Sequence, residues 1–371
     1  MKTTHIGLLG LGTVGKGVAE ALSHQHSVVI EKILVRCTDR YHADLPLTTD
    51  VRDILENPEI DIVVEVMGGI EPAHTYLVAA LEQGKSVVTA NKEVIARFGP
   101  ELMTLARQTH TTLLFEASVG GGLPILDALT WHLRTMPIHA IEGVVNGTTN
   151  FILHQMEQGM NFSEALKRAQ NLGFAEQDPS ADIDGWDSAR KLAILSGLAF
   201  HTWIHPDQGQ VTGISHVRSS HLQQLTRMGF GMRLVGRVER HPTSLGFVVA
   251  PTVYPLGHRY LTLTGSQNAV GIVSDAGTTW IEGPGAGGLA TATSIVSDIQ
   301  RIRFMIPDRE PIRFENRPLD HIDDAYLVFA EDPDQILPII PETLKSGPGF
   351  LILPFPLPPE EGLVQYRYRA K

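Results

Sequence analysis

The sequence has a single cysteine, no excess of positive charge and no long apolar run, and each of these absences excludes a class of protein. Its single cysteine, Cys37, cannot form an internal disulfide, and no Cys/His cluster has the spacing of zinc ligands. Its 30 Lys and Arg residues are outnumbered by 41 Asp and Glu residues, and the formal net charge of -11 argues against a nucleic-acid partner. No apolar run approaches the roughly 20 residues that span a bilayer. We therefore expect a cytoplasmic protein that binds neither nucleic acid nor membranes.

Two stretches with different patterns organise the chain. Over residues 1–123, β-branched runs at 6–9, 28–35, 62–66, 86–89 and 112–115 alternate with helical patterns. This alternation is typical of the α/β class and predicts a Rossmann-type, doubly wound parallel sheet. Helices and strands mix over 124–284, which predicts a second, mixed α/β domain. A helix follows within 285–306, and proline and charge become denser in a C-terminal extension, 307–371.

A glycine-rich turn follows the first predicted strand and opens the first predicted helix. The glycines of the motif are Gly10, Gly12 and Gly15, with Thr13 and Val14 between the last two. In a dinucleotide fold these glycines permit the tight turn, the approach of a pyrophosphate and close packing of helix on strand. We therefore predict a dinucleotide site here. The alternative is that these are ordinary turn glycines.

The end of the second predicted strand bears on the choice of cofactor. A fold that is selective for NAD usually places an acid here to bind the ribose, but this chain has Arg36. A guanidinium pairs well with a 2′-phosphate, so we expect NADP in preference to NAD. The alternative is that Arg36 is a solvated surface residue and Asp39 turns toward the ribose, which would keep NAD possible.

A loop rich in acids leads into a helix between residues 173 and 191. Asp187 and Lys191 lie four residues apart and are therefore neighbours on one helical face. The density of acids suggests a catalytic or binding role. The alternative is an exposed ion pair, which contributes only about 0.3 to 0.5 kcal/mol.

The segment 169–191 resembles the signature of homoserine dehydrogenases, and so do the segments 64–69, 87–92, 115–124 and 145–150. The resemblance covers about 6–303 and keeps the order of the family's motifs. It implies an oxidoreductase that acts on a CH-OH group. The implied reaction is reversible, NAD(P)-dependent hydride transfer between aspartate 4-semialdehyde and L-homoserine, in threonine, methionine and isoleucine biosynthesis.

The resemblance also implies roles for individual residues. Lys191 would exchange a proton with the substrate oxygen, with Asp187 beside it and Lys92 as a second catalytic lysine that also borders the cofactor. The small-molecule substrate would be bound at its ammonium and carboxylate groups by four residues: Glu176, Asp182, Gly147 and Thr148. Gly285 and Gly287 would approach the cofactor as the helix within 285–306 returns to the first domain, unless they form a plain turn before that helix.

Two further features are implied by the family. The loop 116–123 resembles one that holds a sodium ion through the main-chain carbonyls of Glu116, Val119, Gly121 and Leu123. Carbonyl oxygens suit a hard cation, but a glycine-rich crossover between domains would look the same. Family members usually form homodimers through the sheet of the second domain, so this domain would serve both substrate binding and dimerisation, the latter through 234–253.

Two other functions are alternatives for this sequence. Aspartate-semialdehyde dehydrogenase shares a substrate but needs a nucleophilic cysteine, and Cys37 lies at the ribose end of the second strand, far from Lys191. A non-catalytic NADP-binding sensor could retain the fold without turnover. The presence of both Lys92 and Lys191 favours the enzyme.

The C-terminal extension is shorter than the ACT domains of longer relatives. Residues 325–330 are typical of a strand, 331–334 of a turn and 335–340 of the start of a helix, and Pro338 and Pro341 soon interrupt that helix. We interpret the extension as a truncated or degenerate ACT-like module, with an extended structural tail as the alternative. Threonine is therefore expected to leave turnover unchanged.

Overall fold

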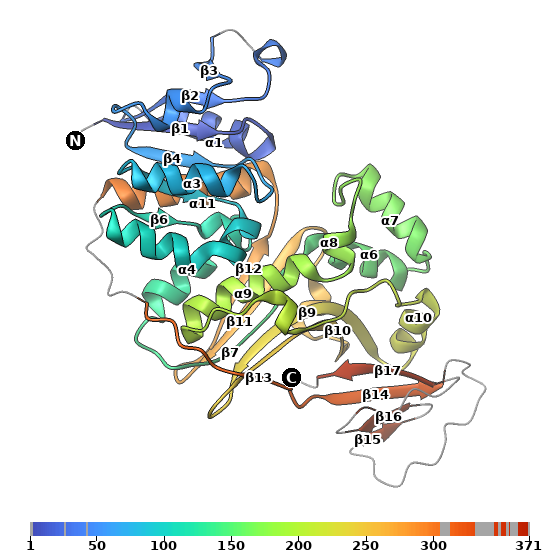
Figure 1. The fold of residues 1–371 in the computed structure, drawn as a ribbon. Helices are drawn as coiled ribbons and strands as arrows, with labels where there is room; N and C mark the ends of the chain where they lie inside the picture. Colours follow the sequence, from blue (N-terminus) through green and yellow to red (C-terminus); the bar gives the residue numbers. More distant parts are fainter. Residues whose placement is uncertain are drawn as a thin grey trace. The chain divides into compact units, whose positions relative to one another are not determined.

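The computed structural model describes residues 3–25, 27–41, 44–304, 312–330, 345–347, 350–353, 356 and 363–369. The chain divides into two compact units, each drawn in Figure 1. The first unit comprises Met1–Met136, Ala193–His205 and Gly283–Asn316, and the second comprises Pro137–Leu192, Pro206–Glu282 and Arg317–Lys371. Among the helices of the described residues, none combines the length and hydropathy needed to cross a membrane.

A parallel sheet of six strands forms the centre of the first unit. Its order is β3-β2-β1-β4-β5-β6, the strand order of a Rossmann fold, which confirms the predicted doubly wound sheet. Sequence reasoning missed β3, because two residues are too few to show a period. The strands are β1 (Thr4–Leu9), β2 (Val28–Leu34), β3 (Leu47–Thr48), β4 (Ile62–Glu65), β5 (Ser86–Thr89) and β6 (Leu113–Leu114).

Helices cover both faces of this sheet. Val18 of α1 (Thr13–Ser23) and Ile295 of α11 (Gly288–Arg303) are buried in one cluster with Ile6 of β1. Burial of each such side chain contributes on the order of 2 kcal/mol. The next residue of β1, Gly7, instead faces Ile54 of α2 (Arg52–Leu55), on the opposite side of the sheet. Further helices are α3 (Ala73–Glu82), α4 (Lys92–Gln108) and α5 (Ile125–Asp127).

A mixed sheet organises the described residues of the second unit. Its order is β12-β11-β7-β9-β10-β17-β14-β16-β15, and β8 and β13 also pair with β10. The strands from the body of the chain are β7 (Ile138–Val144), β8 (Gln210–Val211), β9 (Phe230–Arg240), β10 (Leu245–Pro255), β11 (Gln267–Ser274) and β12 (Gly277–Pro284). The helices are α6 (Gly147–Glu157), α7 (Phe162–Asn171), α8 (Ser180–Ile183), α9 (Trp186–Phe200) and α10 (Ser219–Arg227). Of these, α9 begins in the second unit and ends in the first.

The C-terminal extension continues this sheet. Its strands are β13 (Leu319–Asp320), β14 (Ala325–Ala330), β15 (Lys345–Gly347), β16 (Phe350–Leu353) and β17 (Leu363–Tyr368). Figure 1 shows β14 and β17 side by side, and β17 also pairs in parallel with β10, Thr252 opposite Arg367. The strand predicted at 325–330 is confirmed. The predicted turn at 331–334 and helix at 335–340 lie outside the described residues.

The outer edge of β10 is paired within the chain at three places. It meets β13 at Leu245, β8 at Val248 and β17 at Thr252, while its other edge pairs with β9 along its whole length. β9 in turn pairs with β7 on its far side. The stretch 234–253 therefore lies inside the sheet.

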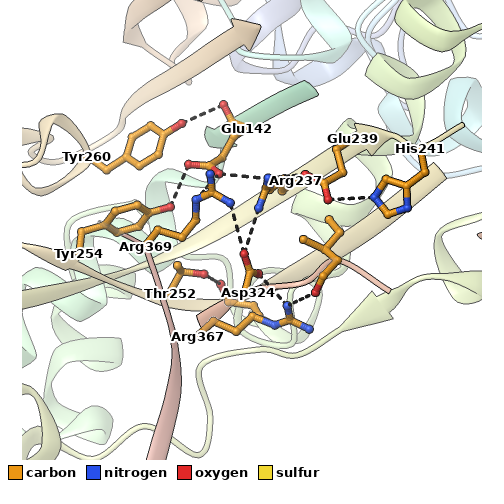
Figure 2. A network of polar contacts seen from close by, with 12 residues as sticks. Glu142, Arg237, Glu239, His241, Thr252, Tyr254, Tyr260, Asp324, Arg367 and Arg369 are labelled. Carbon is orange, nitrogen blue, oxygen red and sulfur yellow. Dashed lines mark hydrogen bonds and ion pairs between the residues drawn. The ribbon is translucent and has the colours of Figure 1, made fainter. Parts of the chain in front are cut away.

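A network of charged residues lies on one face of this sheet (Figure 2). The register places Glu142 of β7 opposite Arg237 of β9, and Asp324 lies 3.0 Å from the Arg237 guanidinium. Two arginines from the end of the chain complete it: Arg367 lies 2.7 Å from Asp324, and Arg369 lies 3.1 Å from Glu142. Gly236, next to Arg237, faces Leu192 of α9, so the helix lies on the other face. The network thus ties the extension to the strands.

The free energy of unfolding should depend on the protonation of Glu142. Burial raises the pKa of its carboxyl to about 7, although Arg237 opposes this shift. The folded protein therefore retains a proton that the unfolded chain releases above its ordinary pKa of about 4.3. The protonated Glu142 carboxyl therefore contributes on the order of 3 kcal/mol to the free energy of unfolding. This contribution is complete below the unfolded-state pKa and is lost as the pH rises through the folded-state pKa of about 7.

Urea unfolding of the wild type and of Glu142→Gln at a series of pH values between about 5 and 8 measures this effect. Relative to the variant, the wild type should lose stability as the pH rises. Parallel pH profiles for the two proteins would show that Glu142 does not titrate in this range.

Candidate functional site

The turn between β1 and α1 has the geometry of a dinucleotide loop. Gly10 has a φ of +104°, which favours glycine, and a Cβ at Gly15 would lie 2.3 Å from the Gly10 carbonyl oxygen. A Cβ at Gly12, by contrast, would meet nothing within 4 Å. The first and third glycines are thus required by the fold, and the second leaves open space. Thr13 and Val14 form the first turn of α1, whose N-terminus suits a phosphate.

The second glycine-rich segment lies beside the first. A Cβ at Gly17 of α1 would lie 2.9 Å from the carbonyl oxygen of Gly288, the first residue of α11. The Gly285 carbonyl oxygen would be 2.7 Å from a Cβ at Gly121, and Gly287 precedes α11 with a φ of +123°. The structure therefore brings Gly287, at the start of α11, close to the first helix and Gly285 close to Gly121.

The ribose end of the loop does not distinguish the two cofactors. Arg36 and Asp39 both lie exposed beyond the end of β2. Asp39 belongs to a 3₁₀ turn, Thr38–Arg40, whose Thr38 hydroxyl donates to the Asp39 carboxylate over 3.4 Å. Either side chain is accessible to a ligand.

Lys92 is the first residue of α4, directly after the end of β5. The preceding Asn91 caps this helix by accepting from the Val94 N–H, and its amide donates to the Gly69 carbonyl over 2.7 Å. Ligands of open α/β sheets bind beyond the carboxyl ends of the strands, which is where this loop places Lys92.

A buried glutamate organises the same loop, and sequence reasoning missed it. Glu65, at the end of β4, accepts hydrogen bonds from the Met67 N–H over 2.7 Å and from the Thr89 hydroxyl over 2.6 Å. The Thr89 hydroxyl in turn accepts from the Asn91 N–H. Burial raises the pKa of Glu65, and the bond from Thr89 opposes that shift. The segment 64–69 carried part of the family resemblance, but no role was predicted for Glu65.

The predicted sodium loop forms a tight turn in the first unit. The carbonyl of Gly121 accepts from the Ser294 hydroxyl over 2.7 Å, that of Leu123 from the Ile125 N–H and that of Glu116 from the Val119 N–H. The Glu116 carboxylate instead accepts from the N–H groups at the start of α5. No group of three or more His, Cys, Asp or Glu side chains is placed to hold a metal ion in the part of the chain that the structure describes.

Lys191 forms the centre of the polar cluster of the second unit. Its Nζ lies 2.6 Å from the Val145 carbonyl oxygen and 2.7 Å from an oxygen of Asp187. Both side chains project from α9, and their residues are only 9% and 2% exposed. This burial contradicts the alternative of an exposed surface pair.

Asn146 joins two acids to this cluster. Its amide nitrogen donates to Asp182 over 2.7 Å and to Asp187 over 2.8 Å. Its amide oxygen accepts from the Thr149 N–H over 2.8 Å and so caps α6. The sequence pointed to the neighbouring Gly147 and Thr148 but not to Asn146, because a cap and a bridge between acids look alike in sequence.

The other predicted substrate residues surround the start of α6. Gly147 is its first residue, and the Thr148 hydroxyl donates to the Phe174 carbonyl over 2.6 Å. Glu176 lies exposed in the loop between α7 and α8. Contacts in the described part of the chain thus bring Asp182, Asp187 and Lys191 together, but they do not include the Glu176 side chain. Lys92 belongs to the first unit.

Two family models match the chain. One, described as Homoserine dehydrogenase, covers residues 124–300, and one described as Homoserine dehydrogenase, NAD binding domain, covers residues 10–116. Together they include every predicted site residue named above except Val119, Gly121 and Leu123, which lie in the short segment between the two models.

Curated relatives give the same result. The chain is 43% identical over 314 residues to homoserine dehydrogenase of Bacillus subtilis, a match that covers 81% of this chain and 72% of that protein. It is 39% identical over 335 residues to homoserine dehydrogenase of a Synechocystis species, covering 86% and 76% of the two chains.

Solved structures are similar over most or all of the chain. A homoserine dehydrogenase from Thiobacillus denitrificans is 31% identical, with a TM-score of 0.89 and coverage of 100% of this chain and 99% of that one. A hyperthermophilic archaeal homoserine dehydrogenase in complex with NADPH is 30% identical, with a TM-score of 0.73 and coverage of 83% and 99%.

The bridge made by Asn146 should be visible in stability. Asn146→Ala removes a helix cap and also leaves two carboxylates without their amide donor. Asn161→Ala is the matched control, because Asn161 caps the next helix, α7, by accepting from the Glu164 N–H but is exposed. Loss of a cap alone costs about 1 kcal/mol. We expect the loss at Asn146 to exceed that at Asn161 by a further 1 to 3 kcal/mol, approximately, in urea unfolding. Equal losses would show that Asn146 acts only as a cap.

Proposed function

The chain belongs to the homoserine dehydrogenase family, and on that premise we propose how its residues divide the reaction. It is an NAD(P)-dependent oxidoreductase that acts on a CH-OH group and interconverts L-homoserine and aspartate 4-semialdehyde. This step belongs to the biosynthesis of threonine, methionine and isoleucine. The observation that supports our assignment of roles is the buried contact of Lys191 with Val145 and Asp187.

Lys191 is the acid and base of this proposal. The bound nicotinamide supplies the hydride in reduction and accepts it in oxidation. During reduction the Lys191 ammonium gives a proton to the aldehyde oxygen, and during oxidation the neutral amine takes the proton of the hydroxyl group. The Val145 carbonyl and the Asp187 carboxylate hold Nζ in one place. Lys92, at the start of α4, is the second catalytic lysine and borders the cofactor.

The start of α6 and the acidic loop bind the substrate's charged groups in our proposal. Glu176 and Asp182 attract the ammonium. Because the Thr148 hydroxyl already donates to Phe174, the main-chain N–H groups of Gly147 and Thr148 take the carboxylate, and the positive end of the helix favours that charge. Asn146 keeps Asp182 and Asp187 in place.

NADP is the proposed cofactor. The first-unit loop from Gly10 to Gly15 and the returning segment with Gly285 and Gly287 would hold its pyrophosphate and nicotinamide halves. Arg36 is exposed where a 2′-phosphate would lie, and a relative with the same fold is known with NADPH. NAD remains the alternative through Asp39.

A sodium ion is also proposed, at the carbonyls of Glu116, Val119, Gly121 and Leu123. A carbonyl oxygen has two lone pairs, so one that accepts a hydrogen bond is still able to bind a cation. Exchange of sodium for choline in the assay should lower turnover, and added sodium should restore it. Unchanged turnover would contradict this site.

The remaining proposals concern organisation. Residues 1–123 would bind the cofactor, 124–284 the substrate and a second copy, 285–306 would return to the cofactor and 307–371 would be the extension. We propose a cytoplasmic homodimer. Because β9 and β10 lie inside the sheet, a second copy would meet side chains of 234–253 and not an open strand edge. Sedimentation equilibrium measures the oligomeric state.

Removal of the Lys191 amine should abolish most turnover. We expect Lys191→Ala to lower kcat for homoserine by about a hundredfold, the usual size for loss of an acid or base, and to leave cofactor affinity unchanged. Lys167→Ala is the matched control, because Lys167 is an exposed lysine of α7 in the same unit. Near-normal turnover of Lys191→Ala would refute the proposed role.

Cofactor preference depends on Arg36 in this proposal. Arg36→Ala should weaken NADP binding by about tenfold or more and change NAD binding much less, because only NADP offers a charged partner. Arg107→Ala, an exposed arginine in the last turn of α4, is the control. Fluorescence titration with both cofactors measures the effect. Tighter binding of NAD than NADP by the wild type would favour Asp39 at the ribose.

A further inference from the structure

The end of the described chain contacts the strand that leads to Lys191. Arg369 follows β17, and its Nε lies 3.1 Å from Oε2 of Glu142 in β7. Its main-chain N–H donates to the Val253 carbonyl over 3.0 Å, which fixes the backbone of Arg369 against β10. Its guanidinium also donates to Asp324 over 3.3 Å. Figure 2 shows Arg369 next to Glu142 and Asp324, residues from segments that are far apart in the sequence.

Strand β7 connects this network to the proposed catalytic lysine. β7 ends at Val144, and the carbonyl of the next residue, Val145, accepts from Lys191. Asn146, the residue after that, donates to Asp187. β7 pairs with β11 on one side and β9 on the other, so it is a rigid element and not a loop. A shift of the main chain at Glu142 would therefore be passed along the strand to the Val145 carbonyl, three residues away.

The charged groups around Glu142 form ion pairs of opposite charge. The arginines are Arg237, Arg367 and Arg369, and the acids are Glu142, Glu239 and Asp324, with His241 3.0 Å from Glu239. The Tyr254 hydroxyl donates to the Glu142 carboxylate over 3.0 Å, and the Tyr260 hydroxyl donates to the Glu142 carbonyl over 2.9 Å. Without the Arg369 guanidinium, Glu142 would keep the Tyr254 hydroxyl and Arg237 at 3.7 Å but lose its 3.1 Å ion pair, so its carboxylate would settle in a different position.

We propose that Arg369 is a positioning residue for the reaction: by holding Glu142 it sets the place of β7, and thereby of the Val145 carbonyl and the Lys191 ammonium. The proposal rests on the proposed role of Lys191. If Arg369 has this role, the C-terminal extension contributes to catalysis in the second unit. A mutation far from the chemistry that misplaces a reacting group by about 1 Å can lower the rate by about a hundredfold. A smaller shift of Lys191, passed along β7, should therefore lower kcat measurably.

The first test compares Arg369→Met and Arg369→Lys in the full chain at a pH of about 8, where the Glu142 carboxyl is ionised. Arg369→Met keeps the apolar length without the charge, and kcat per folded enzyme should fall by about tenfold with the KM for NADP unchanged. Arg369→Lys should recover most of kcat, because an ammonium can also pair with Glu142. Arg227→Met, an exposed arginine of α10 in the same unit, is the control.

The second test is a double-mutant cycle with Glu142→Gln. If Arg369 acts through Glu142, the double variant should lose little more kcat than the worse single variant, whereas independent effects would multiply. The cycle also covers the case in which Arg369→Met does not fold, because Glu142→Gln alone should then lower kcat and Arg369→Lys should not.

The results separate this proposal from the role of Lys191. Wild-type kcat in folded Arg369→Met, or multiplying effects in the cycle, would overturn the positioning role even if Lys191→Ala is inactive. A purely structural role would lower the midpoint of urea unfolding and leave kcat per folded enzyme unchanged. Normal turnover of Lys191→Ala would instead refute the proposed function itself.

Discussion

The Lys191 ammonium is a buried charge, and a buried charge must be paired and hydrogen-bonded to be stable. Much of the second unit is arranged around that constraint. The Val145 carbonyl comes from the end of β7, Asp187 comes from the preceding turn of α9, and Asn146 fixes Asp187 from the start of α6. Helix, strand and cap therefore have to meet at one point, and the sheet beneath them has to hold β7 in register.

Local patterns were sufficient for the parts of the structure that depend on neighbours in sequence. The alternation of strands and helices predicted the parallel sheet, and the spacing of Gly10, Gly12 and Gly15 predicted a turn that the backbone geometry explains glycine by glycine. The pair Asp187 and Lys191 was predicted in the same way, because residues four apart share a helical face. Its burial was not predictable from that spacing.

Contacts between distant segments account for what sequence reasoning missed. Nothing near Arg367 indicates that it will lie opposite Thr252, because a parallel pairing depends on the path of the chain between the two strands. Asn146 is similar: the motif suggests a helix cap, whereas its contact with Asp182 exists only when the start of α6 meets α8. Glu65 was overlooked because its partners, the Met67 N–H and the Thr89 hydroxyl, belong partly to another strand. The sequence therefore showed which side chains are able to take part in chemistry, but not how many partners each of them contacts in the fold.

The pairing of β10 with β17 has a consequence for the synthesis of the protein. More than a hundred residues separate the two strands, so β10 is complete long before its neighbour leaves the ribosome. At ordinary rates of translation this delay is on the order of ten seconds. During that time the Thr252 end of β10 lacks its partner β17, and unpaired strand edges of this kind are surfaces on which nascent chains aggregate. Conditions that slow translation of the last part of the chain should therefore reduce the yield of folded protein more than conditions that slow its beginning.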